Sequence, residues 1–338
     1  MGDCASYCIT KEGEIEVNPD RPKEALKIEV SCNKKAESPR KSFFGGSSKV
    51  AENIFQINAE KIVMEQEVVN ELYRSKGPYS YKPLPDDGVE RVLRDITELE
   101  NGNIYYGFWS IPMDSQDGNG VMIWPDGSRY DGSWKQGQTN GHGRLLHANG
   151  DLYEGGWVGD KVNGHGIYLH KDGTKYEGCW VADKQNGRGI ETWPDGSRYE
   201  GMYKDGMKHG VGIFVWADGS EYRGEFLENN LDGKGEYKWN NGKVYIGFWK
   251  ENKMEGKGKF EWPDGKKYNG NYADDKRDGQ GKMTWPDGRT YDGQWKAGSQ
   301  HGLGRFTDAN GVSKLGEWAE GKLLRWVDDD YQTQLVSS

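Results

Sequence analysis

The first eight residues, MGDCASYC, match the pattern of an N-terminal acylation site. Gly2 and Ser6 fit Met-Gly-x-x-x-Ser, in which the glycine amine accepts myristate, and Cys4 and Cys8 are candidates for palmitoylation. One acyl chain holds a protein on a bilayer only weakly, so a second chain or a basic patch is needed. Asp3 disfavours myristoylation, so an unmodified tail stays the alternative.

A basic stretch follows this motif and ends near residue 50. Its cations are Lys34, Lys35, Arg40, Lys41 and Lys49. Between residues 32 and 50 they oppose one acidic residue, and two phenylalanines lie among them. A basic patch beside an acyl chain binds anionic lipid headgroups. We therefore predict that residues 1–49 form a disordered arm that binds an anionic membrane.

The charge of the remaining chain disfavours nucleic acid as a partner. The whole chain carries a net charge of -9, and the arm of residues 1–49 carries +1, so the part after it carries -10. A phosphate-binding surface is normally basic. The same charge weakens the hypothesis that the later residues bind phosphoinositides.

The histidines of the chain do not have metal-site spacing. His142 and His165, like His147 and His170, are 23 residues apart and take equivalent positions in a repeat. Equivalent positions in adjacent hairpins lie about 10 Å apart, farther than two ligands of one zinc ion allow. The segment DSQDGNG (114–120) matches half of a calcium loop, but no glutamate follows at the twelfth position. We expect neither a metal nor a cofactor.

No catalytic motif set is present in the sequence. It lacks both the Gly-x-x-x-x-Gly-Lys-Ser/Thr phosphate loop and the motifs of a protein kinase, so we predict that the protein is not an enzyme. Cys4, Cys8, Cys32 and Cys179 form no CxxC pair, which suits a reducing cytosol. No apolar run reaches the roughly 18 residues of a membrane-spanning helix. We expect a cytoplasmic protein without a spanning helix or a secretory signal.

Most of the chain repeats one motif every 23 residues. A Tyr-x-Gly-x-aromatic segment begins at Tyr105, at Tyr130 and then at this interval up to Tyr291, and a degenerate copy begins at Lys314. A Gly-x-Gly segment follows each copy that begins with tyrosine, and an Asp-Gly or Asn-Gly pair ends each repeat. Such pairs adopt the positive φ angles of tight turns, so each repeat is predicted to be a β-hairpin.

The alternation of side chains assigns the residues of each hairpin to two faces. Tyr, Gly and Trp of the first strand share one face with both glycines and the large ring of the second strand. Rings are therefore expected to pack on bare glycine backbone. Two strands at about 4.8 Å spacing advance the sheet by roughly 10 Å, so the repeats predict an elongated, single-layer antiparallel β-meander about 90 Å long.

The segments around the repeats have their own patterns. Apolar residues at Ile54, Ile57, Ile62, Val69 and Leu72 indicate an amphipathic helix within residues 50–76. Residues 77–101, rich in proline at first, read as a linker and entry strand. The repeats occupy 102–318, and residues 319–338 are predicted to be a cap over the last strand and a tail.

Units such as YEGGWVGDKVNGHGIYLHKDG (153–173) resemble MORN repeats, with Tyr-Glu-Gly-x-Trp, a polar loop, Gly-x-Gly and a closing Asp-Gly. The resemblance covers about two thirds of the chain and nine phased copies. Proteins of this family include radial spoke head proteins, junctophilins and membrane-skeleton proteins of single-celled eukaryotes. It implies a scaffold or membrane-apposed adaptor, with no catalysis in the repeats.

The aromatic face is the predicted partner groove, and an amphipathic helix or an extended peptide would fit it. Its residues are Tyr130, Trp134, Tyr153, Trp157, Tyr176, Trp180, Trp193, Tyr199, Tyr203, Trp216, Tyr222, Trp239, Tyr245, Trp249, Trp262, Tyr268, Trp285, Tyr291 and Trp295. The opposite face is apolar in the first half, at positions such as Val121, Ile123 and Leu146, which predicts a second layer there. The helix within 50–76 is the candidate for that layer, docking either on its own chain or on a neighbouring copy.

Two classes of function remain open. The protein is either a membrane-apposed scaffold that links a membrane or a cortical or ciliary cytoskeleton to protein partners, or a membrane-free structural subunit of a ciliary assembly. Self-association through an open sheet edge is compatible with both.

Overall fold

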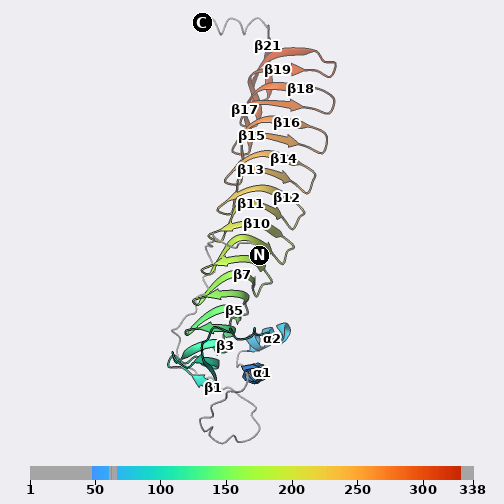
Figure 1. Cartoon of the computed structure of the whole chain (residues 1–338). Coiled ribbons are helices and arrows are strands. Elements are labelled where there is room, and N and C mark those ends of the chain that lie inside the picture. Colours follow the sequence, from blue (N-terminus) through green and yellow to red (C-terminus); the bar gives the residue numbers. More distant parts are fainter. Residues whose placement is uncertain (1–47, 61, 63–66, 329–338) are drawn as a thin grey trace, which may run out of the picture. The chain divides into compact units, whose positions relative to one another are not determined.

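The computed structural model describes residues 48–60, 62 and 67–328, which form two helices and 21 strands. The elements are α1 (Ser48–Ala59), α2 (Glu67–Lys76), β1 (Arg91–Glu98), β2 (Ile104–Ser110), β3 (Ser115–Ile123), β4 (Arg129–Lys135), β5 (Gln138–Leu146), β6 (Leu152–Val158), β7 (Lys161–Leu169), β8 (Lys175–Val181), β9 (Lys184–Thr192), β10 (Arg198–Lys204), β11 (Met207–Val215), β12 (Glu221–Leu227), β13 (Asn230–Lys238), β14 (Val244–Lys250), β15 (Lys253–Glu261), β16 (Lys267–Ala273), β17 (Lys276–Thr284), β18 (Thr290–Lys296), β19 (Ser299–Thr307), β20 (Ser313–Ala319) and β21 (Lys322–Val327). The chain divides after Pro194 into two compact units. The first holds both helices and β1–β9, and the second holds β10–β21 (Figure 1).

Each unit is an open antiparallel meander in which every strand pairs with the next one along the chain. In the second unit, for example, β14 pairs with β13 on one side and with β15 on the other. The glycines of the repeats face each other across these pairs, as Gly247 does with Gly235 and with Gly258. The predicted all-β meander of repeat hairpins is confirmed.

The Asp-Gly segments make the predicted chain reversals. Between β3 and β4, the Gly127 amide donates to the Trp124 carbonyl (2.9 Å) and the Trp124 amide donates to the Ser128 carbonyl (3.0 Å). The Asp126 carboxylate accepts from the Ser128 amide (2.8 Å), and Gly127 takes a φ of 90°. Glycine is needed here because L-residues rarely adopt this φ.

From β4–β5 onward, the other end of each hairpin is a two-residue turn that the sequence pattern did not predict. Between β14 and β15 the turn residues Glu251 and Asn252 both have positive φ, 48° and 68°, as a type I′ turn requires. The Asn252 side chain accepts from the Leu231 amide (2.8 Å) in the preceding hairpin. The repeat therefore has two kinds of turn, and the tighter one binds each hairpin to its neighbour.

Buried tyrosines form the core of the sheet on the aromatic face. The nine repeat tyrosines from Tyr105 to Tyr291 are at most 1% exposed, and each hydroxyl donates to the carbonyl three residues ahead at 2.8–3.1 Å. The Tyr245 ring packs edge-to-face on Trp249 (5.1 Å between centroids) and on Tyr272 of the next repeat (5.2 Å). A Cβ on Gly247 would lie 2.4 Å from the Tyr245 hydroxyl. The glycines are therefore seats for these rings.

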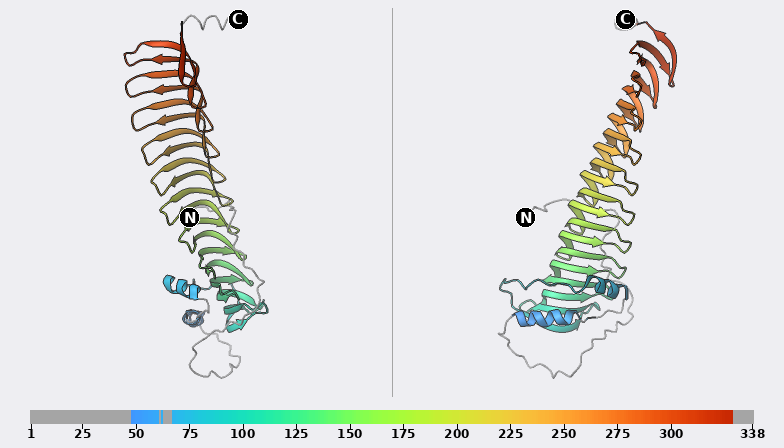
Figure 2. Two further views of the ribbon diagram at one scale, coloured as in Figure 1. Left: turned by 180° about the vertical axis from the view of Figure 1, so that it is seen from behind. Right: turned by 90° about the vertical axis from the view of Figure 1, so that its right-hand side faces the viewer.

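In the first unit a helical layer covers the opposite face, here called the outer face (Figure 2). Phe55 of α1 stacks on Tyr106 of β2, with 5.4 Å between ring centroids, and lies 5.6 Å from Phe108. Val69 of α2 is fully buried in the same cluster, which also includes Leu146 of β5. The predicted second layer is present.

Two details of the predicted helix within residues 50–76 are wrong. Two helices, α1 and α2, replace a single one. The stripe of α1 that meets the sheet contains Phe55 and Ala59, whereas the expected core residues Ile54 and Ile57 are 49% and 55% exposed. Small Ala59 lets α1 approach the strands closely, which the hydrophobicity pattern does not encode.

The last strands extend the meander beyond the repeats. β21 pairs with β20 and places Trp326 opposite Gly316. Leu324 and Trp326 of β21 remain exposed.

Candidate interaction surfaces

Most of the predicted lipid-binding residues lie outside the described part of the chain. This holds for Gly2, Cys4 and Cys8, and for the cations Lys34, Lys35, Arg40 and Lys41. Lys49 lies exposed in the first turn of α1. Neither described helix is long and apolar enough to cross a membrane.

Many rings of the predicted groove are interior rather than accessible. These are Tyr130, Trp134, Tyr153, Trp157, Tyr176, Trp180, Tyr199, Tyr203, Tyr222, Tyr245, Trp249, Tyr268, Tyr291 and Trp295, each at most 6% exposed. Their faces and edges are occupied by each other and by glycine backbone, so they hold the sheet together. A partner would have to unfold a hairpin to reach them.

A second row of rings on the same face is half-buried and open to a partner. Trp193 in the first unit, and Trp216, Trp239, Trp262 and Trp285 in the second, stand where each Gly-x-Gly strand ends. In the second unit, aromatic rings within the strands lie between these tryptophans. Together they form a continuous set, named the aromatic row: Phe214, Trp216, Tyr237, Trp239, Phe260 and Trp262. Consecutive ring centroids of the aromatic row lie 4.3–5.2 Å apart.

The aromatic row is continuous because the repeat has a fixed period. Each strand contributes its own ring and the next tryptophan, as Tyr237 and Trp239 do (4.4 Å), and Trp239 then meets Phe260 of the following hairpin (5.2 Å). Rings in such tilted contact give a rigid, amphipathic surface that loses little side-chain entropy on binding. Tyr237 and the two phenylalanines were not among the predicted site residues, although their 23-residue spacing could have identified them.

A buried ion pair fixes the helical layer on the first unit, and the sequence pattern did not reveal it. Arg129 of β4 is fully buried and donates twice to the Asp131 carboxylate (2.7 and 2.6 Å). It also donates to the carbonyls of Ile62 (2.9 Å) and Ala59 (3.1 Å), at the end of α1. Its guanidinium lies over the Tyr73 ring, 4.2 Å from the centroid. Ala59 is the last residue of α1, so one of these contacts satisfies a helix-end carbonyl, and the other holds Ile62 just beyond the helix.

Charge is retained at this buried site. Burial disfavours the charged guanidinium, but the Asp131 carboxylate outweighs that effect and holds the pKa of Arg129 above its ordinary value. Tyr81, from the segment after α2, donates to the same carboxylate at 2.7 Å. α1, α2 and the segment that follows them thus converge on one ion pair.

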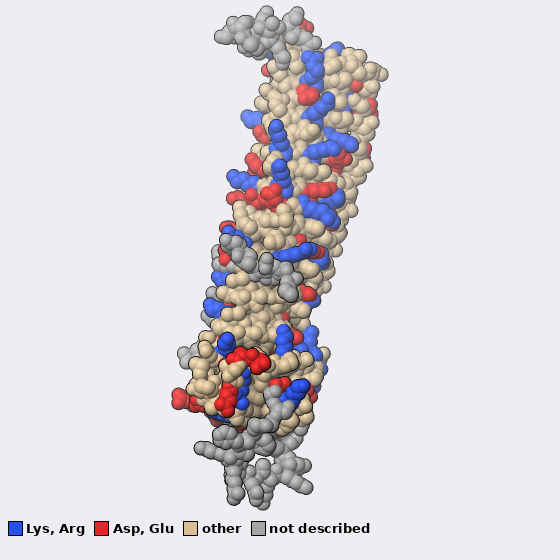
Figure 3. Space-filling view, viewed as in Figure 1, with Lys and Arg blue, Asp and Glu red and all other residues tan. Residues whose placement is uncertain are grey.

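The histidines and acidic groups take structural positions. The hydroxyl of Tyr79 lies 2.8 Å from Nδ1 of His142, and burial, followed by the charge of Lys82, lowers the pKa of His142. Asp117, from the half calcium loop, pairs with Arg91 at 2.7 Å. Among the described residues, no three His, Cys, Asp or Glu side chains lie close enough to hold a metal ion. Lys and Arg are interspersed with Asp and Glu over the face shown in Figure 3.

The fold defines a repeat-built β-sheet protein with half-buried aromatic rings on one face and exposed apolar side chains on the other. A model of the MORN repeat matches residues 113–129, 130–152, 153–175, 176–198, 199–221, 222–244, 245–267, 268–288 and 291–313. The chain belongs to the MORN-repeat family. MORN repeats are non-enzymatic modules that mediate protein or membrane interactions.

Comparison with other proteins adds distant likenesses. No curated protein matches the chain. Among solved structures, the TCP10 domain of Danio rerio CPAP, in complex with a peptide of Danio rerio STIL, is 13% identical with a TM-score of 0.38, over 71% of this chain and 99% of that one. The Drosophila melanogaster SAS-4 TCP domain, in complex with a proline-rich motif of Ana2, is 15% identical with a TM-score of 0.27, over 58% of this chain and 98% of that one. At these TM-scores neither likeness bears on the function.

Proposed function

We propose that this MORN protein is a non-catalytic scaffold that links a membrane, or a cortical or ciliary cytoskeletal structure, to protein partners. The aromatic row carries the proposal, because its rings, all half-buried except the buried Phe260, form an unbroken strip on the second unit. Large surface rings that line up in this way are typical of protein-binding surfaces.

The partner on the aromatic row is an amphipathic helix or an extended peptide. Either ligand lays apolar side chains along a line, and the rings of the row supply a line of apolar surface with polar edges. Trp216 and Trp239 are the central anchors, because each touches a ring on both sides along the row.

The membrane end of the scaffold is the N-terminal arm. Gly2, Cys4 and Cys8 supply acyl acceptors, and Lys34, Lys35, Arg40, Lys41 and Lys49 supply the basic patch. Two such signals together give stable membrane attachment, whereas one does not. We therefore propose that the protein acts at the cytoplasmic face of a membrane, at the cell cortex or in a cilium.

Fractionation of cells that express matched variants tests both ends of the scaffold. We expect Gly2→Ala to move the protein from the membrane fraction to the soluble fraction. Trp216→Ala combined with Trp239→Ala should leave membrane attachment intact but remove the protein from the detergent-insoluble fraction, which contains the cytoskeleton. Met202→Ser, on the outer face of β10, is the control and should change neither. If Gly2→Ala has no effect, the protein is instead a membrane-free subunit of an assembly such as the ciliary axoneme.

A further inference from the structure

The outer face of the second unit has an apolar site that matches the seat of α1 in the first unit. In β2, the outward residues Ile104, Tyr106 and Phe108 lie beneath α1. Among the other strands with the Tyr-x-Gly-x-aromatic segment, only β14 has three apolar residues on the outer face, as β2 does. They are Val244, Ile246 and Phe248, and this set is named the β14 seat.

The two seats correspond residue by residue. β2 reads IYYGFWS and β14 reads VYIGFWK, so both place an aliphatic residue first and a phenylalanine third on the outer face. In β2 the layer of α1 leaves Tyr106 5% and Phe108 2% exposed. In β14 the equivalent Ile246 and Phe248 are 51% and 42% exposed. Burying such side chains is favourable by roughly 25 cal/mol per Å² of apolar surface.

We propose that the β14 seat binds an amphipathic helix of a partner protein in the way that the β2 seat binds α1. The stripe of α1 that meets the sheet, Ala51–Phe55–Ala59, rises about 12 Å along a helix. The span from Val244 to Phe248 along β14 is about 13 Å. A partner helix with an aromatic residue, and with a small residue one turn before it and one turn after it, therefore fits the β14 seat.

The charges beside the β14 seat specify acidic borders for that helix. Lys234 lies opposite Phe248, Lys238 opposite Val244, and Lys259 opposite Ile246; Lys257 lies next to Lys259 on the same face. Two glutamates on these strands form ion pairs, Glu236 with Lys238 (3.0 Å) and Glu261 with Lys259 (2.5 Å). A third glutamate, Glu255, pairs with Phe248 across the strands and accepts from the Asp274 amide (3.0 Å).

Glu236 and Glu261 neutralise Lys238 and Lys259, so Lys234 and Lys257 supply the cations beside the seat. Asp232 and Glu255, at its Phe248 end, each accept from a turn amide. The Lys234 ammonium lies 5.5 Å from the centre of the Phe248 ring. In contrast, the β2 seat is bordered by apolar Val121 and Ile123 of β3. The partner helix should accordingly carry glutamate or aspartate along both borders of its apolar stripe; the polar residues beside the stripe of α1 are Glu52, Gln56 and Asn58.

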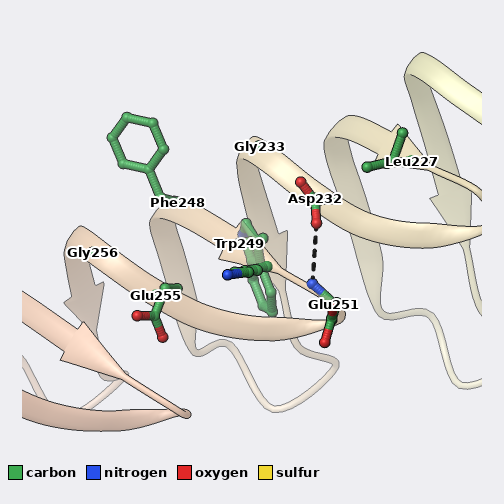
Figure 4. A pocket seen from close by; sticks show the side chains of 9 residues that line it. Leu227, Asp232, Gly233, Phe248, Trp249, Glu251, Glu255 and Gly256 are labelled. Carbon is green, nitrogen blue, oxygen red and sulfur yellow. Dashed lines mark hydrogen bonds between the residues drawn. The ribbon is translucent and has the colours of Figure 1, made fainter.

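A shallow depression of about 580 Å³ extends the seat at its Phe248 end (Figure 4). Phe248, Trp249 and Leu227 line it together with carboxylates. Asp232 accepts from the Glu251 amide (3.2 Å), so this carboxylate caps a turn. The depression adds apolar surface for one side chain at the end of the helix.

Titration of the full-length protein with a synthetic peptide tests the proposal. The peptide carries Ala, Phe and Ala at positions i, i+4 and i+8, with glutamates on both borders; a second peptide carries lysines on the borders instead. We expect saturable binding of the acidic peptide, weakened more than about tenfold by Phe248→Ser. Lys234→Glu with Lys257→Glu should weaken it by several-fold, with a smaller effect at high salt. The lysine-bordered peptide should bind more weakly than the acidic one.

Three controls separate binding at the seat from binding elsewhere and from a loss of folding. Met202→Ser removes an exposed apolar residue at the same repeat position two hairpins earlier and should leave binding unchanged. Trp216→Ala with Trp239→Ala alters the aromatic face and should also leave binding of the acidic peptide unchanged. Binding at the β14 seat is thereby distinguished from binding at the proposed scaffold site. Thermal unfolding of Phe248→Ser should match the wild type, because the ring is exposed.

Several results would overturn the proposal. One is the absence of saturable binding at about 1 mM peptide, and another is binding that Phe248→Ser does not weaken. A third is self-association in sedimentation equilibrium that Phe248→Ser abolishes, which assigns the seat to a second copy. Binding of phosphatidylserine vesicles that Phe248→Ser abolishes, without competition by the acidic peptide, assigns it to lipid.

Discussion

The contact between the tyrosines and the glycines can be tested at Gly212. The backbone of Gly212 has an ordinary φ, but a Cβ there would lie 2.5 Å from the hydroxyl oxygen and 2.6 Å from Cε2 of Tyr199. Tyr199 is fully buried, its hydroxyl donates to the Met202 carbonyl (2.9 Å), and its ring packs edge-to-face on Tyr203 (5.2 Å). The ring therefore has no space into which it can move.

The magnitude follows from these contacts. Overpacking of a close-packed core costs about 1–3 kcal/mol, and displacement of the ring also loses its hydrogen bond, at about 1 kcal/mol. We expect Gly212→Ala to lower the free energy of unfolding by about 3 kcal/mol. Gly219→Ala is the control: its φ is +84°, no atom lies within 4 Å of the added Cβ, and its cost should be the backbone term of about 1–2 kcal/mol.

Urea unfolding of the full-length chain measures both variants, and hydrogen exchange of the β10 and β11 amides reports the local effect, because repeat hairpins depend mainly on their neighbours. A double-mutant cycle with Tyr199→Leu isolates the contact. With the ring removed, the added methyl group should cost about 2 kcal/mol less. A coupling free energy below about 0.5 kcal/mol, the usual limit of additivity, would refute this role of the glycines.

Two further predictions concern charge. Burial raises the pKa of Tyr268 and Tyr291 to about 12, whereas tyrosine in an unfolded chain titrates near 10; their stabilisation is therefore complete below pH 10 and is lost as the pH rises through about 12. Tyrosinate absorbance should rise together with loss of the circular dichroism signal, and ionisation while the signal persists would contradict this. Asp131→Asn leaves the buried Arg129 without its counter-charge, at about 3–5 kcal/mol, so hydrogen-exchange protection of α1 and α2 should fall, whereas Asp292→Asn at the exposed equivalent position should not change it. Unaltered protection in Asp131→Asn would show that the ion pair does not hold the helical layer.

Net charge is a poor description of the individual surfaces. The sequence carries -10 after residue 49, which argued against anionic partners for the repeats. The strands decide which charges are neighbours: near β14, Glu236 and Glu261 pair with Lys238 and Lys259, while Lys234 lies against the Phe248 ring. The register of strand pairing shows which charges are neighbours, and the amino-acid composition carries no information about that register.

The repeat hairpins were predictable because their determinants are local. A 23-residue period, an Asp-Gly turn and the alternation of Tyr, Gly and Trp each act over a few residues of one hairpin. They determined the strands, the meander and the seating of rings on glycines. The family resemblance followed from the same local pattern.

Tertiary structure decided which surfaces remain open. Two rows of rings look alike in the sequence, but edge-to-face packing between adjacent hairpins buries the Tyr245 and Trp249 row and leaves Trp239 half-exposed. Likewise, the β2 and β14 seats have the same residue pattern, but α1 docks on the β2 seat, whose neighbouring strand is apolar, whereas charged residues border the β14 seat. Burial depends on contacts between residues far apart in the chain, so the sequence determined the repeat and the fold determined its accessible surface.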